Sequence, residues 1–345
     1  MHKRSICLFF TFLVISHGLS LLAAEPQWLN DGKLSWVSYA PIFAPVERPD
    51  DPCYSVKDPS IVFFEGRYHI FATIRSEKRT HQIEYISFTD WKNTDEAKRC
   101  VLTMHSGFFC APQIFYFTPH KKWYLICQAS DPGWKEKYGS EYGAAFSTTE
   151  TIADPDSWSS LTPLGAEKVG DNAGLDFWII CDSKKAYLFF TTLDGKMWRE
   201  ETPLNEFPHG WSKPKLAIEG DIFEASHTYK IKGKDSYLTI VEAQNGPGWR
   251  YYKAYTAEKL DGNWKPLADS KEKNFASMNN VRFKDQRWSD SISHVELIRA
   301  GIDETMEIDP SHLRLIYQGV TDSDLEGKVY GQIPWKLGVL ESETK

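Results

Sequence analysis

A pattern of two strand-like runs joined by a polar turn recurs along the chain, and it constrains the fold more than any other feature. Each copy has a short apolar and aromatic run, a polar turn and a second run headed by tyrosine. The clear copies are Ile61–Thr73, Ile114–Gln128, Phe177–Thr191 and Thr228–Glu242, with tyrosines Tyr68, Tyr124, Tyr187 and Tyr237. A looser copy with a longer insertion extends from Ile292 to Tyr317.

Repeats of roughly 40–60 residues, each holding a few strands, are typical of a β-propeller. Residues 58–345 have room for about five such units, and long helical periodicity is hard to find. A β-sandwich would also contain hairpins, but it would not need this repeat length. The sequence therefore predicts an all-β, five-bladed β-propeller, with residues 25–345 forming a single domain.

The N-terminus has the features of a secretory signal peptide over residues 1–24. Lys3 and Arg4 precede an apolar run, Ile6–Ile15, and small residues end the segment before Glu25. An N-terminal anchor is the alternative, although the run is short for a membrane-spanning helix. We expect a protein that is secreted to the periplasm or the medium, with no membrane association in the mature form.

Charge and cysteine content narrow the classes of partner and cofactor. The net charge is −7 without a long basic run, which argues against a nucleic-acid partner. Beyond the signal segment the cysteines are odd in number and lack C-x-x-C spacing, so neither a disulfide framework nor a zinc site is indicated. A single bridge between Cys53 and Cys100 stays open. We expect a monomer.

Propeller geometry brings distant residues together, because the innermost strand of every blade lines one central channel. The residues just before the predicted first strands are Asp58, Ala111, Asp176, Glu224 and the Ser293–His294 pair. Glycoside hydrolysis needs two carboxyl groups, one that protonates the leaving oxygen and one that attacks the sugar or activates water. A third carboxylate nearby raises the acid's pKa by charge repulsion. Asp58, Asp176 and Glu224 fit this scheme.

Several segments together resemble glycoside hydrolase family 62, the α-L-arabinofuranosidases that act on arabinoxylan and are related to the family 43 propellers. The segments are Ala111–Phe117, Tyr187–Phe190, Asp194–Gly195, Phe223–Ala225, Tyr237–Ala243, Arg250–Tyr252, Thr256–Trp264, Ile292–Arg299, Asp303–Pro310 and Tyr317–Gly319. They occur in the family's order over most of residues 57–319.

The resemblance implies a role for each matching residue. Asp58 corresponds to the general base, Glu224 to the general acid, and Asp176 to the aspartate that modulates the acid's pKa and orients the sugar. The family inverts configuration, so a water should lie between Asp58 and the sugar. Lys57, Gln128, Arg250 and Tyr317 correspond to positions near the bound sugar, and His294 to a histidine that helps hold a structural Ca²⁺. No cofactor is implied for the chemistry itself.

The resemblance has departures that bear on substrate preference. The family often has Trp after the glutamine aligned with Gln128, where this chain has Ala129, and Pro59 follows Asp58 as in the family 43 propellers. We expect an exo-acting enzyme that removes arabinofuranosyl groups from arabinoxylan or arabinan. A family 43-like β-xylosidase or arabinanase on the same fold is the first alternative. A non-catalytic sugar-binding propeller is the second.

Overall fold

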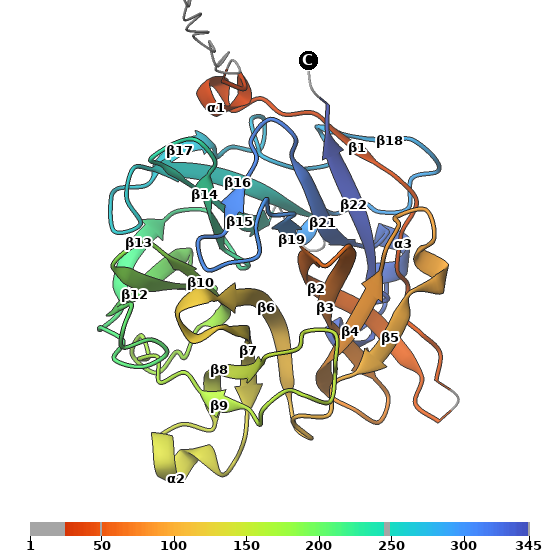
Figure 1. The fold of residues 1–345 in the computed structure, drawn as a ribbon. Helices are drawn as coiled ribbons and strands as arrows, with labels where there is room; N and C mark the ends of the chain where they lie inside the picture. The colour runs from red at the N-terminus through yellow and green to blue at the C-terminus, as the bar shows by residue number, and fades with distance from the viewer. Residues whose placement is uncertain (1–24, 49, 245–248, 344–345) are drawn as a thin grey trace, which may run out of the picture.

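Five mainly antiparallel sheets surround a common centre in the computed structural model, which describes residues 25–48, 50–244 and 249–343. Chain colour advances from sheet to sheet around the ring in Figure 1. The prediction of an all-β, five-bladed propeller is confirmed. The predicted signal peptide lies outside the described residues, and within them no helix is long and apolar enough to cross a bilayer.

The first three blades each have four strands, ordered outward from the centre. The first blade comprises β2 (Cys53–Phe64), β3 (Arg67–Ser76), β4 (His81–Phe88) and β5 (Lys98–Val101). The second comprises β6 (Phe109–Phe117), β7 (Lys122–Ser130), β8 (Tyr142–Thr149) and β9 (Thr162–Pro163). The third comprises β10 (Leu175–Cys181), β11 (Lys185–Thr191), β12 (Lys196–Pro203) and β13 (Lys215–Glu219).

The fourth and fifth blades each recruit strands from elsewhere in the chain. The fourth comprises β14 (His227–Ile231), β15 (Tyr237–Gln244), β16 (Arg250–Ala257) and β17 (Lys265–Ala268), and β20 (Glu307–Ile308) pairs with β14. The fifth comprises β19 (Ser293–Leu297), β21 (Arg314–Gly319), β22 (Lys336–Ser342), β1 (Trp36–Ser38) and β18 (Val281–Phe283). The insertion expected in the fifth copy thus contains β20, which reinforces the fourth blade.

The helices are short and lie in the connections between strands. The α-helices are α1 (Trp28–Asp31), α2 (Trp134–Tyr138) and α3 (Asp322–Leu325). The 3₁₀ turns are η1 (Thr94–Glu96), η2 (Thr118–His120) and η3 (Tyr330–Gln332).

The ring is closed by the N-terminal strand β1, which lies beside the C-terminal strand β22 (Figure 1). Trp36 of β1 pairs with Ser342 in an antiparallel ladder, and its indole N–H donates to the carbonyl of Phe275 at 2.7 Å. The buried Trp36 side chain supplies the apolar contact that holds β1 in the fifth blade, because a large aromatic side chain contributes most of the energy of such a contact. The two ends of the described chain therefore stabilise one blade together.

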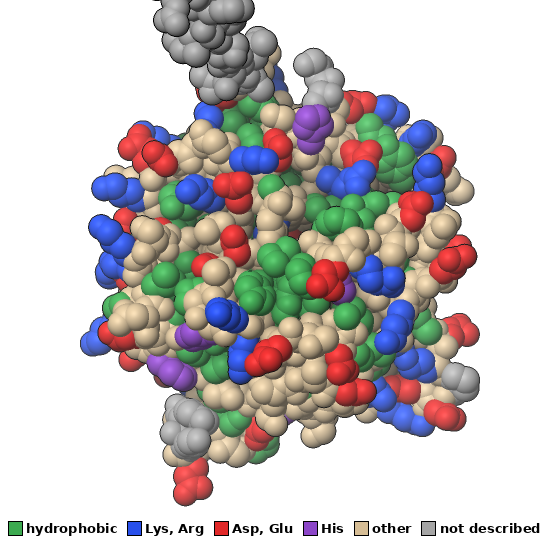
Figure 2. Space-filling model, in the orientation of Figure 1, with side chains coloured by type: hydrophobic (Ala, Val, Ile, Leu, Met, Phe, Trp, Pro, Cys, Tyr) green, Lys and Arg blue, Asp and Glu red, His purple; other side chains and the backbone are tan. Residues whose placement is uncertain are grey.

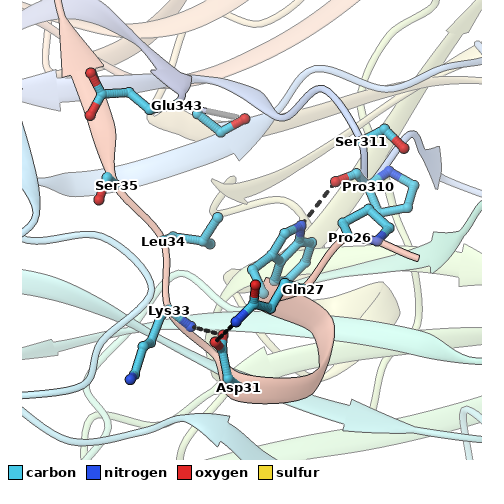
Figure 3. Close-up of a pocket in the computed structure, with 11 residues that line it drawn as sticks. Pro26, Gln27, Asp31, Lys33, Leu34, Ser35, Pro310, Ser311 and Glu343 are labelled. Atoms are coloured by element: carbon cyan, nitrogen blue, oxygen red, sulfur yellow. Dashed lines mark hydrogen bonds between the residues drawn. The ribbon is translucent and has the colours of Figure 1, made fainter. Parts of the chain in front are cut away.

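Helix α1 lies at the periphery and borders a pocket of about 470 Å³ (Figure 3). The indole N–H of Trp28 donates to the carbonyl of Pro310 at 2.9 Å, which anchors the helix to the loop after β20. Residues that line this pocket do not include any of the catalytic carboxyl groups expected from the sequence. On the face drawn in Figure 2, acidic and basic side chains are interspersed around apolar ones.

Three blades are tied together inside the channel by Arg299, whose side chain is buried. One guanidinium nitrogen, Nη2, donates to the carbonyls of Ile61 at 3.0 Å and Ile114 at 2.6 Å, which belong to β2 and β6. Arg299 follows β19 of the fifth blade. Burying an arginine whose N–H groups have acceptors costs less free energy than burying an unpaired one. The bonds of Arg299 therefore fix the inner strands relative to one another.

Candidate active site

The inner strand of each blade, or in the fourth blade the segment just before it, has one residue with a left-handed backbone, and these five residues form what we call the bulge ring. Its members, with φ from 39° to 53°, are Asp58, Ala111, Asp176, Ala225 and His294. In four blades the strand pairing shifts register at this residue, which marks a β-bulge. A left-handed backbone is costly for residues with a side chain, and bulges near active sites re-aim side chains.

The bulge ring corrects the sequence prediction in two respects. The predicted residues precede the inner strands only in the fourth blade, whereas Asp58 lies well inside β2 and Asp176 inside β10. In the fourth blade the bulge residue is Ala225, so Glu224 comes one position earlier. Glu224 is therefore equivalent to Lys57 of the first blade and not to Asp58. Asp58 is thus the bulge residue itself, whereas Glu224 lies one position before its bulge.

A second set of residues, one from the second strand of each blade, lies opposite the residue that precedes each bulge. This support ring consists of Thr73, Gln128, Thr191, Glu242 and Gln318. Four of its members accept the bulge N–H of the next blade, at distances of 2.7 to 3.1 Å. The pairs are Thr73 with Ala111, Gln128 with Asp176, Glu242 with His294 and Gln318 with Asp58.

The third blade breaks this pattern at Thr191. The Ala225 N–H is accepted by Oδ2 of Asp176 at 2.9 Å, and Thr191 Oγ1 has no hydrogen-bond partner among the described residues. Asp176 therefore supports the segment that carries Glu224. The repeated bonds explain how five strained residues persist, because each is held by a neighbouring blade.

Asp58 is buried and paired with a buried cation. Lys57 Nζ lies 3.1 Å from Oδ2 of Asp58, and His294 Nδ1 lies 3.4 Å from Oδ1. Burial alone would raise the pKa of Asp58, but the Lys57 ammonium lowers it to about 2. Asp58 is thus a carboxylate at neutral pH, as a base that activates water must be. Lys57, expected beside the sugar, contacts both Asp58 and the hydroxyl of Tyr330 at 3.3 Å.

Glu224 contacts Arg250, another residue expected at the sugar site. Arg250 Nη1 donates to Oε1 of Glu224 at 2.5 Å and to Oε1 of Glu242 at 2.9 Å. The guanidinium lies over the rings of Phe223 and Trp335, 5.1 and 5.7 Å from their centroids. Asp58 and Glu224 are therefore each paired with a different cation, Lys57 and Arg250.

Asp176 has the most strongly perturbed carboxyl group of the three candidates. Burial raises its pKa well above the usual range, and the charges of Glu224 and Asp58 raise it further. Like charges in a buried site disfavour ionisation of all of them together. Asp176 was expected to act on Glu224 by repulsion, and here the same repulsion favours the neutral form of Asp176 itself.

The side chains of Gln128 and Tyr317, both expected to contact sugar, form hydrogen bonds within the protein. The Gln128 side chain bonds the Asp176 N–H at 3.1 Å and the Cys110 sulfur at 3.1 Å. Tyr317 is wholly buried, its hydroxyl bonds Ser38 at 2.7 Å, and its ring stacks on Trp288. Tyr317 therefore offers no free surface to a ligand, which corrects its assignment as a sugar contact. Residues alternate along β21, so Gln318 faces the channel in its place.

Two residues of the site were missed by sequence reasoning. Glu242 is fully buried, and its sequence signal was an acidic residue within an apolar strand. Tyr330 lies in η3 with 47% of its surface exposed, and its ring centroid is 5.1 Å from Lys57 Nζ. Tyr330 comes from the connection between β21 and β22, which carries no repeat signal. An exposed aromatic ring beside the carboxyl groups is suited to stacking against a sugar.

The expected Ca²⁺ ligand, His294, faces Asp58 and touches the ring of His227 at a centroid distance of 5.5 Å. Among the described residues, no three His, Cys, Asp or Glu side chains are grouped so that they could hold a metal ion. Calcium prefers six to eight oxygen ligands, so these side chains do not form a calcium cage by themselves. The five cysteines within the described residues are all free.

The fold is a five-bladed propeller whose buried carboxyl groups include an ionised aspartate, Asp58, and a separate glutamate, Glu224, and such a pair is what glycoside hydrolases use. The family model of glycosyl hydrolase family 62 matches residues 36–341, and the chain belongs to this family. Because the match covers every blade, the resemblance seen in the separate sequence segments is confirmed.

Individual relatives agree with this assignment. The chain is 39% identical over 316 residues to α-L-arabinofuranosidase C of Cellvibrio japonicus, a match that covers 89% of this chain and 47% of that protein. It thus spans about half the length of that relative. The catalytic domain of a Coprinopsis cinerea family 62 α-L-arabinofuranosidase is 34% identical, with a TM-score of 0.81 over 90% of this chain and 97% of that one. A family 62 hydrolase solved with xylotriose is 31% identical, with a TM-score of 0.82 over 92% of this chain and 100% of that one.

Proposed function

We propose that the protein is a secreted, exo-acting α-L-arabinofuranosidase that removes arabinofuranosyl side groups from arabinoxylan with inversion of configuration. The observation that carries the proposal is the buried Asp58–Lys57 pair, which keeps one carboxylate ionised while Glu224 lies in a separate contact with Arg250. Membership of family 62 and the name of the Cellvibrio relative support the arabinofuranosyl specificity. The xylotriose bound in a relative's structure favours a xylan backbone.

In this mechanism Asp58 accepts a proton from a water, which then attacks the anomeric carbon of the arabinofuranosyl group. Glu224 donates a proton to the departing glycosidic oxygen, so that the leaving group departs as an alcohol. Asp176 holds the Glu224 segment through the N–H of Ala225 and adds a negative charge when it is ionised. Tyr330 and Lys57 contact each other beside Asp58, where they can orient the sugar.

The test is incubation of the mature protein with wheat arabinoxylan, debranched arabinan and an aryl β-xyloside, followed by chromatography of the products. The proposal expects free arabinose from arabinoxylan and an intact xylan backbone. Release of xylose, or of arabinan oligosaccharides, would instead establish a family 43-like activity. Absence of turnover on all three, with binding of arabinoxylan retained, would leave a sugar-binding propeller.

A further inference from the structure

Glu242 differs from the other members of the support ring because its side chain is a carboxyl group, whose pKa burial raises to about 7 although the charge of Arg250 opposes this. Thr73, Gln128 and Gln318 accept a bulge N–H with a neutral oxygen. Oε2 of Glu242 does the same for the His294 N–H at 2.7 Å and also accepts from Ser293 Oγ at 3.0 Å. A neutral amide oxygen would therefore suffice to accept the His294 N–H, and the carboxyl group of Glu242 needs another explanation.

The other carboxylate oxygen supplies that explanation. Oε1 of Glu242 accepts Nη1 of Arg250 at 2.9 Å, and the same nitrogen donates to Oε1 of Glu224 at 2.5 Å. Glu242 is completely buried and Arg250 nearly so. Thus one buried cation is shared by two carboxyl groups, of which one is the proposed acid.

The balance of charge changes during the proposed reaction. When Glu224 is protonated, Arg250 and Glu242 form a neutral pair, so the buried cation stays compensated. Without Glu242, Arg250 would depend on Glu224 alone, and protonation of Glu224 would leave a buried cation unpaired, which is strongly unfavourable. The other titratable groups that act on Glu224 or Glu242 are Asp176, His294, Tyr252 and Tyr330.

We propose that Glu242 is a positioning residue for the hydrolysis: it is the counter-ion of Arg250 when Glu224 is protonated, and it thereby leaves Glu224 free to hold and donate a proton. The inference rests on the proposed function for its kinetic consequence. Its structural part, the ion pair between Glu242 and Arg250, does not involve the substrate.

The kinetic test uses Glu242→Gln, which keeps an oxygen for the His294 N–H and replaces the oxygen that accepts from Arg250 with an uncharged NH2 group. We expect kcat for arabinose release from arabinoxylan to fall about 10²-fold, with KM within about twofold of wild type, since the lost effect belongs to proton donation. The matched control is Glu200→Gln in β12, where an equally buried glutamate accepts the Glu167 N–H and, within the described part of the chain, bonds no residue of the site. Its kcat should equal that of wild type. Unchanged kcat in Glu242→Gln, or a parallel loss in both variants, would overturn the proposal.

A double-mutant cycle with Arg250→Met tests the pairing without any substrate. In the Arg250 background, Glu242→Gln should lower Tm by about 5 °C or more, as expected for a broken buried ion pair. In the Arg250→Met background the same change should cost less than half as much, because the cation is gone. Equal losses in the two backgrounds would overturn the proposal. A wild-type protein inactive on arabinoxylan would refute the proposed function while the cycle still decides the pairing.

Discussion

The carboxylate of Asp176 accepts the backbone N–H of Ala225 at 2.9 Å, and this bond connects the third blade to the segment that carries Glu224. In the other blades a second-strand side chain makes the corresponding bond. Here the second-strand residue, Thr191, leaves that bond to Asp176. Asp176 therefore supports the segment of the proposed acid through this bond, and it repels Glu224 when both carboxyl groups are ionised.

Replacement of Asp176 by Asn should separate these two roles. The amide oxygen can still accept the Ala225 N–H, so the fold should persist, whereas the charge coupled to Glu224 and Asp58 is lost. We expect a lower kcat and a displaced pH–rate profile. A lower rate with an unchanged profile would leave Asp176 as a sugar ligand alone.

Asp176→Asn should also change the thermal stability of the protein in a way that depends on pH. The pKa of Asp176 is raised on folding by burial and by its acidic neighbours. A group of this kind stabilises the native state below its unfolded pKa, and that contribution is lost as pH rises through the folded pKa. Melting curves should therefore show that Asp176→Asn gains more in Tm, relative to wild type, at pH 8 than at pH 5.

Removal of either catalytic carboxyl should nearly abolish turnover. Asp58→Ala and Glu224→Gln should each lower kcat by about 10²–10⁴-fold, the usual contribution of a positioned acid or base. Arabinose release from arabinoxylan is the measurement. More than about a tenth of wild-type activity with a normal melting curve would refute the assignment for that residue.

The Asp58 variant needs its own control because its partner is a buried cation. Asp58→Ala leaves the Lys57 ammonium without a carboxylate, which should cost stability. The double variant Lys57→Met/Asp58→Ala should regain most of the lost Tm but none of the activity. Recovery of activity in the double variant would show that Asp58 acts only by neutralising Lys57.

Much of the fold could be predicted because hairpin repeats are local. The tyrosines Tyr68, Tyr124, Tyr187 and Tyr237 each lie at or near the start of a second strand, as the repeat indicated. Closure by β1 could not be predicted, because Trp36 pairs with Ser342 about 300 residues away and no local signal links them. The contribution of β20 to the fourth blade is equally non-local.

The site was predictable only in part, for a similar reason. Asp58 and Asp176 were predicted because their places in the repeat are equivalent, and both lie on the bulge ring. Glu224 was predicted from its residue type, but its one-residue offset depends on the bulge at Ala225. Tyr317 was misplaced because strand alternation, and not sequence similarity, decides which face a residue occupies. Glu242 was overlooked because its partner, Arg250, lies on the next strand.

Stability at alkaline pH should depend on Glu200, a buried carboxyl group outside the site. Burial raises its pKa from 4.5 to about 8, although the Glu167 N–H opposes this. Its favourable contribution is therefore present below about pH 4.5 and is lost as pH rises towards about 8. We expect the Tm of Glu200→Gln minus that of wild type to increase between pH 5 and pH 9, measured by calorimetry. A difference that is constant with pH would contradict this assignment.

The stereochemical outcome gives the sharpest test of the proposed pair. Inversion requires a water between Asp58 and the sugar, so the two carboxyl groups should be about 6.5–9.5 Å apart in a crystal structure with a bound arabinose analogue. A separation of about 5 Å would indicate a retaining enzyme with a covalent intermediate, and one beyond about 12 Å would exclude Asp58 and Glu224 as a pair. Proton NMR of a fresh reaction provides an independent check. Because water attacks the face opposite the leaving group, β-arabinofuranose must appear first and the α-anomer only later by mutarotation. Early appearance of the α-anomer would assign Asp58 as a nucleophile and end the inverting proposal.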